Sequence, residues 1–155
     1  MKNIFKLSTI LLASFSLFSC GETDNTTTFD LYINKYNDGK LVEEIEKTST
    51  DDTYVYKMVF LARNHTGKAV IIPTSELNLK IGDKEYKPVF FALTWKMISN
   101  SDGKSSYYVD TSTETAQIES KENELLNVFP CFEVDPTGKE YTIEYKGSAL
   151  KHFGE

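Results

Sequence analysis

The cysteines and histidines are the residues of this sequence best suited to nucleophilic or metal chemistry, and their spacing supports neither. His65 and His152 are far apart, and the chain has no Cys-x-x-Cys motif and no calcium-loop spacing. Cys131 lies in an apolar run at 128–132, where a lone cysteine is more often a small core residue than a nucleophile. Two histidines are too few to supply the usual general base beside it.

The acidic residues are numerous enough to suggest cation binding or hydrolysis, but their pattern is unspecific. Asp51 and Asp52, with Glu43, Glu44 and Glu46 nearby, could chelate a hard cation. Adjacent carboxylates on a strand point to opposite faces, so solvated surface charges explain them better. No Gly-x-Ser-x-Gly elbow or phosphate-binding glycine loop is present. We therefore expect no catalytic, metal or cofactor site and no enzyme activity, with a small hydrolase as the weakest alternative.

The first twenty residues have the pattern of an export signal. Lys2 and Lys6 form a positive start, an uncharged and mostly apolar run follows at 10–18, and the small Ser19 precedes Cys20. The apolar run is shorter than the roughly 20 residues that span a bilayer, so the pattern predicts a cleavable signal peptide and no permanent transmembrane helix.

Leu17-Phe18-Ser19-Cys20 resembles the lipobox of bacterial lipoproteins, in which the cysteine is acylated and becomes the first residue after cleavage. Phe18 departs from the pattern, since a small residue is usual there. The resemblance implies a signal peptide at 1–19, cleavage between Ser19 and Cys20, and a membrane anchor of palmitate-type acyl chains on Cys20 in the bacterial cell envelope. Two alternatives stay open: an ordinary signal peptide with an incidental cysteine, and a Cys20–Cys131 disulfide.

Composition limits the partners of the mature chain. Removal of 1–19 takes away Lys2 and Lys6 and none of the 23 acidic residues, so the formal charge falls from −6 to −8. Nucleic acid requires a basic face, so we expect none as a partner. The polar segment at 20–28 cannot bury apolar surface and should be a flexible tether.

Short alternating segments predict strands in one domain at 29–146. Strand patterns cover 29–33, 41–47, 53–63, 69–72, 77–81, 125–134 and 141–145, separated by turns such as Asn37–Lys40. The segment 89–98 is ambiguous between strand and helix, the segment from Tyr107 onward is weakly specified, and Pro130 implies an edge or bulge. The tail at 147–155 should be loose. The fold class expected is an all-β antiparallel sandwich.

Three segments together resemble an immunoglobulin-like domain common in exported bacterial lipoproteins. They are TYVYKMVFLARNHTG at 53–67, LNLKIGDKEYKP at 77–88 and FEVDPTGKEYTIEY at 132–145. The likeness covers about two thirds of the mature chain. It implies an immunoglobulin-like β-sandwich outside the cytoplasm without implying a reaction.

Three aromatic residues are candidates for recognition. Trp95, Tyr107 and Tyr108 lie in the least regular region, and exposed loop aromatics often form binding surfaces. A place for Trp95 in a core with Phe90 and Phe91 is favoured over exposure, and Tyr107 and Tyr108 should face opposite ways on a strand. We expect a non-enzymatic binding or adhesion module with an envelope or extracellular protein or glycan as partner. The alternative is an inhibitor or immunity-type lipoprotein, whose negative charge would suit a basic hydrolase or toxin.

The lipid anchor on Cys20 is tested by the intact mass of the protein purified from its native membrane, beside a Cys20→Ala variant. We expect a chain that starts at residue 20 and carries acyl chains, because two or more chains give firm anchoring, and we expect the variant to lack them. A mature chain found unmodified in the medium, and unaffected by the substitution, would contradict the anchor.

Overall fold

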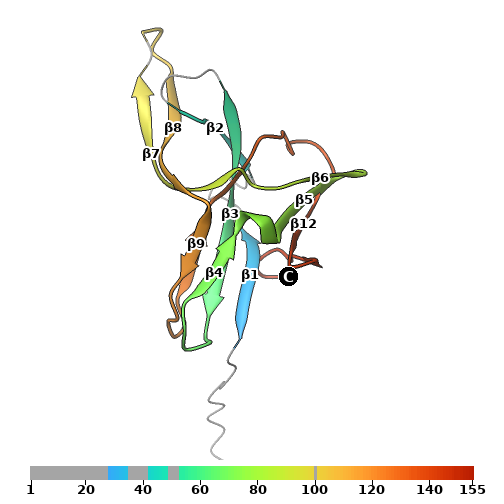
Figure 1. The fold of residues 1–155 in the computed structure, drawn as a ribbon. Coiled ribbons are helices and arrows are strands. Elements are labelled where there is room, and N and C mark those ends of the chain that lie inside the picture. The colour runs from blue at the N-terminus through green and yellow to red at the C-terminus, as the bar shows by residue number, and fades with distance from the viewer. Residues whose placement is uncertain (1–27, 35–41, 49–52, 100) are drawn as a thin grey trace, which may run out of the picture.

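A computed structural model describes residues 28–34, 42–48, 53–99 and 101–155. The expected signal peptide, Cys20, most of the tether and the Asn37–Lys40 turn lie outside these ranges. The described chain is all-β with mainly antiparallel sheets and a single short 3₁₀ helix (Figure 1). Its elements are β1 (Phe29–Asn34), β2 (Val42–Glu46), β3 (Tyr54–Asn64), β4 (Val70–Pro73), η1 (Thr74–Glu76), β5 (Leu77–Ile81), β6 (Lys84–Tyr86), β7 (Phe90–Ser99), β8 (Ser105–Thr113), β9 (Thr115–Ile118), β10 (Leu125–Val128), β11 (Pro130–Phe132), β12 (Thr142–Tyr145) and β13 (Ser148–Ala149).

Strand β3 is the centre of the largest sheet because four other strands pair with it. β1 pairs with its C-terminal half and β2 with its N-terminal half, both antiparallel, and the register shifts by seven residues between the two. β10 and β11 also pair with β3 and keep one common register along it. The eleven residues of β3 are therefore hydrogen-bonded along most of their length, which suits their Val, Tyr, Met and Phe content.

Five strands of this sheet close into a ring. β11 pairs with β3 and with β7, β7 pairs with β8, and β8 reaches β2 through a parallel bridge between Tyr108 and Glu46. β2 returns to β3. The five strands each give one residue to a small shared core: Ile45, Val55, Ala92, Val109 and Cys131. Closure of the sheet at this level encloses these side chains.

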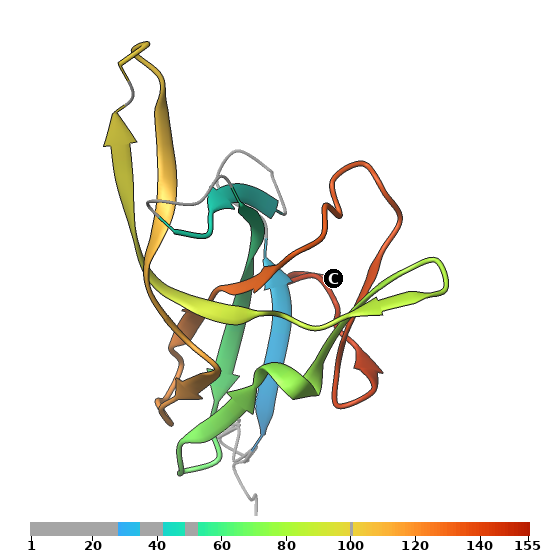
Figure 2. The same ribbon diagram turned by 45° about the horizontal axis from the view of Figure 1, so that its top comes forward.

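A second and larger core joins the remaining strands to the other face of β3. Met58, Phe60 and Ala62 lie on the face of β3 opposite to Val55 of the small core, as the two-residue period of a strand requires. They pack with side chains from β1, from the pair β4–β9 and from the sheet β13-β12-β5-β6. Figure 2 shows this last sheet to one side of β3 and the hairpin β7–β8 extending away from both.

The strand predictions are largely confirmed, with informative differences. The ambiguous segment 89–98 is strand β7, and the weakly specified stretch after it forms β8 and β9. Its many Ser and Thr residues gave no apolar alternation, yet pairing with β7 and β4 orders it. The predicted strand 125–134 is divided at Phe129, because Pro130 has no N–H to donate to a ladder.

The C-terminal tail differs from the expectation that it would be loose. β13 pairs with β12, and the N–H of Ile33 donates to the carbonyl of Lys151 at 2.9 Å. The N–H of Phe153 in turn donates to the carbonyl of Ile33, also at 2.9 Å. These bonds occupy backbone groups along the outer edge of β1, and such backbone pairing is invisible in side-chain composition.

Asn64 is a buried polar residue that fixes the end of β3. Its side chain donates to the carbonyls of Lys68 at 2.9 Å and Ile118 at 2.8 Å, while its oxygen accepts from the N–H and hydroxyl of Thr66. Gly67 completes the turn with a φ of +76°, which costs glycine little. The Asn-His-Thr-Gly motif is thus explained as a turn that ties β3 to β9.

Replacement of Asn64 by alanine should lower the free energy of unfolding by about 2–3 kcal/mol, because buried carbonyl and N–H groups lose their partners. Chemical denaturation measures the change. Asn127, exposed on β10, gives the matched control, and Asn127→Ala should cost less than about 0.5 kcal/mol. Equal losses in the two variants would contradict the structural role of Asn64.

Candidate functional site

The hairpin β7–β8 carries all three predicted recognition aromatics. It projects beyond the rest of the molecule in two views (Figures 1 and 2). Trp95 and Val109 are paired across it, as are Met97 and Tyr107 two pairs further out. A strand alternates its side chains, so these four residues share one face and Tyr108 lies on the other. The expectation that Tyr107 and Tyr108 face opposite ways is confirmed.

The outer part of the hairpin exposes large apolar side chains. Met97 is 57% exposed and Tyr107, directly opposite, is 41% exposed. Leu93, 56% exposed, lies where the register between β7 and β8 shifts. The sequence indicated Tyr107 but neither Met97 nor Leu93, because the exposure of Met97 follows from the hairpin extending past the small core and Leu93 lies at an irregularity in strand pairing.

The root of the hairpin is held by Lys57, a buried lysine in β3. Only 1% of Lys57 is exposed, and its ammonium lies 3.4 Å from the ring centroid of Trp95 and 5.5 Å from that of Phe129. The Trp95 and Phe129 rings meet edge to face, with centroids 4.9 Å apart. Trp95 therefore packs on the small core, which agrees with the expectation that it lies in a core. Its neighbours there are Phe90 and Phe129, whereas Phe91 belongs to the larger core.

Glu43 supplies the negative charge that Lys57 requires. Its carboxylate lies 3.0 Å from the ammonium, and the two residues are directly paired between β2 and β3. Burial of a charge is costly unless it is paired, and an aromatic face adds attraction when the cation is desolvated. In the sequence Lys57 only interrupted an apolar pattern, and Glu43 was one of several acids. Neither residue carried a signal that could have selected it.

The surrounding structure also engages the carboxylate of Glu44 and encloses the thiol of Cys131. Glu44 accepts a hydrogen bond from the Tyr56 hydroxyl at 2.7 Å, and this bond is the main cause that raises the pKa of Tyr56 to about 12. Cys131 is fully buried opposite Lys57, and desolvation raises the pKa of its thiol to about 12. At neutral pH the thiol is protonated and enclosed, which is the reverse of a reactive cysteine.

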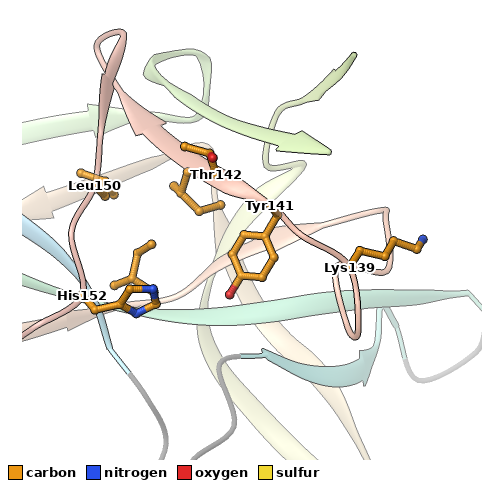
Figure 3. A pocket seen from close by; sticks show the side chains of 7 residues that line it. Lys139, Tyr141, Thr142, Leu150 and His152 are labelled. Carbon is orange, nitrogen blue, oxygen red and sulfur yellow. The ribbon is translucent and has the colours of Figure 1, made fainter. Parts of the chain in front are cut away.

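A small cavity lies beside the C-terminal segment, away from the hairpin. Its volume is about 250 Å³. Figure 3 shows His152 on one side of Tyr141 and Lys139 on the other. Its lining residues are Ile33, Lys139, Tyr141, Thr142, Ile143, Leu150 and His152.

The chain matches no known protein family, curated protein or solved structure. Within the described ranges, no three His, Cys, Asp or Glu side chains are grouped so that they could hold a metal ion. The same residues include no helix with the length and apolarity of a membrane span.

Because Glu43 and Lys57 form an ion pair, replacing Glu43 alone should cost more stability than replacing both residues. Glu43→Gln should destabilise the protein by about 1–2 kcal/mol, since the buried ammonium keeps its desolvation cost and loses its counter-charge, and Glu43 itself is partly exposed. Addition of Lys57→Met should restore most of the loss, because the buried charge is then absent. Denaturation followed by fluorescence of Trp95, the sole tryptophan, measures both.

Glu46→Gln, on the same strand, is the control for this pair and should change stability by less than about 0.5 kcal/mol. A Glu43→Gln variant as stable as that control would show that the ion pair does not hold the hairpin root.

Proposed function

We propose that this protein is a lipid-anchored bacterial envelope lipoprotein whose domain, an immunoglobulin-like variant of the β-sandwich, acts as a non-enzymatic binding or adhesion module. The lipobox-like sequence at Cys20 supports the anchor, and the antiparallel strands around a shared core support the domain class. The polar segment at 20–28 would hold the domain off the membrane surface.

The observation that carries the binding role is the apolar outer half of β7–β8. Met97 and Tyr107 expose large side chains on an element that extends past its own core, and Leu93 is a third exposed apolar side chain nearer the hairpin root. Exposed apolar groups gathered on one element mark interaction sites more often than singly scattered ones do. Methionine and tyrosine are also enriched in protein interfaces.

The partner that fits this surface best is a protein strand or loop with apolar side chains. Beyond Ala92, whose N–H donates to the carbonyl of Phe129, β7 is paired only with β8 in the described chain, so its outer edge offers backbone groups for strand addition. Lys96, paired with Asp110 at 2.8 Å on the opposite face, keeps the hairpin polar on that side. A glycan would stack on Tyr107 alone, because Trp95 is engaged with Lys57.

Photo-crosslinking tests this role. A photoreactive amino acid is placed at Met97 in the full chain expressed in its own envelope, with a second chain carrying it at Glu122, an exposed residue outside the hairpin, as the control. We expect a discrete adduct from position 97 that excess unlabelled protein competes away and excess Met97→Glu/Tyr107→Glu protein does not.

Adducts that are equal at the two positions, or unaffected by the competitors, would contradict binding through the hairpin. A basic envelope hydrolase or toxin in the adduct, with loss of its activity on binding, would favour the inhibitor alternative.

A further inference from the structure

The cavity beside the C-terminal segment contains two polar groups that the described chain leaves unsatisfied. The hydroxyl of Tyr141 and Nδ1 of His152 are each withdrawn from solvent, and neither has a hydrogen-bond partner. Such a group costs about 1–3 kcal/mol when it stays unpaired, so native structures keep few of them. Figure 3 shows the Tyr141 hydroxyl directed toward the side of the cavity on which His152 lies.

Both groups can donate to the same acceptor. The Tyr141 hydroxyl is a donor, and Nδ1 of His152 is a donor in one neutral tautomer and in the protonated ring. The two oxygens of a carboxylate can accept one hydrogen bond from each, and charge-assisted bonds of this kind are stronger than neutral ones. A carboxylate between the two rings would thus satisfy both unpaired atoms.

The charge and the shape of the cavity restrict the ligand further. Its described lining contains Lys139 and no acidic residue, although the whole chain has a net charge of −6. Leu150 supplies a partly exposed apolar side chain beside the polar groups, and the buried Ile33 and Ile143 lie behind it. A volume of about 250 Å³ lies just below the range of roughly 300–1,000 Å³ that drug-sized ligands occupy. The fitting ligand is small, anionic and partly aliphatic.

We propose that this cavity is a binding site for a short-chain aliphatic carboxylate, with Tyr141 and His152 bonding the carboxylate and Leu150, backed by the buried Ile33 and Ile143, lying beside the chain. The site is independent of the hairpin, since none of its lining residues belongs to β7 or β8. It joins three parts of the chain: β1 gives Ile33, β12 gives Ile143, and the C-terminal segment gives His152.

Butyrate is the probe, with 1-butanol as its uncharged match. The full chain in detergent micelles, labelled at isoleucine and leucine methyl groups, is titrated with each compound and followed by NMR. We expect saturable shifts of the Ile33, Ile143 and Leu150 methyl signals with butyrate. Tyr141→Phe and His152→Ala should each weaken butyrate binding by about tenfold, the effect of one lost hydrogen bond to a charged group. Tyr86→Phe, a tyrosine outside the cavity lining, should bind as the unaltered chain does.

Three outcomes would overturn the site. The first is methyl shifts that stay linear up to on the order of 100 mM butyrate, since such weak contact is not specific binding. The second is equal affinity for butanol, which would remove the role of the carboxylate. The third is undiminished binding in Tyr141→Phe with its methyl spectrum intact. Because the hairpin takes no part in this readout, its result is separate from that of the crosslinking experiment.

Discussion

The projecting part of this protein depends on the Lys57 ammonium, which forms an ion pair and lies against an aromatic ring. The ammonium from β3 lies against Trp95 of β7, is paired with Glu43 of β2, and lies among the residues of the small core. One side chain therefore connects three strands of the closed sheet at the place where the hairpin leaves it. A methionine or leucine there could fill similar space, but it would bring no positive charge to attract a carboxylate or to form a cation–π contact with an indole ring.

Closure of the sheet explains why a buried charge is tolerated at this position. The small core receives one apolar residue from each of five strands, and the Lys57 ammonium lies against Trp95 and Phe129, which pack on that core. Glu43 remains partly exposed while its carboxylate reaches inward. The pair therefore escapes part of the desolvation cost that two fully buried charges would carry. The larger core on the other face of β3 is apolar and needs no such arrangement.

Much of the fold could be predicted from the sequence, because local alternation decides where strands form. The residues of β3 alternate and are rich in aromatic and β-branched types, and they form the longest strand. The hairpin β7–β8 was harder, since its outer half has few neighbours to bury and its second strand is rich in Ser and Thr. Pairing between strands distant in sequence, such as β3 with β11 and β8 with β2, leaves no local pattern.

The candidate sites were predictable only in part, for a related reason. Aromatic type selected Trp95 and Tyr107, but type alone could not distinguish the one packed against a lysine from the one that is exposed. Tyr141 was recognised as part of an alternating strand and His152 as an isolated histidine, and only the return of the C-terminal segment to β1 brings them to one cavity. Such convergence depends on tertiary structure.

The most direct test of this account is the proton NMR spectrum of the Lys57 side chain. A methylene group beside an ammonium 3.4 Å from the Trp95 ring centroid lies within the shielding region of the indole. The account therefore predicts Lys57 Hε signals well upfield of their random-coil position, with nuclear Overhauser contacts to the Trp95 ring. Lys57 Hε signals at the random-coil position without contacts to Trp95 would contradict it.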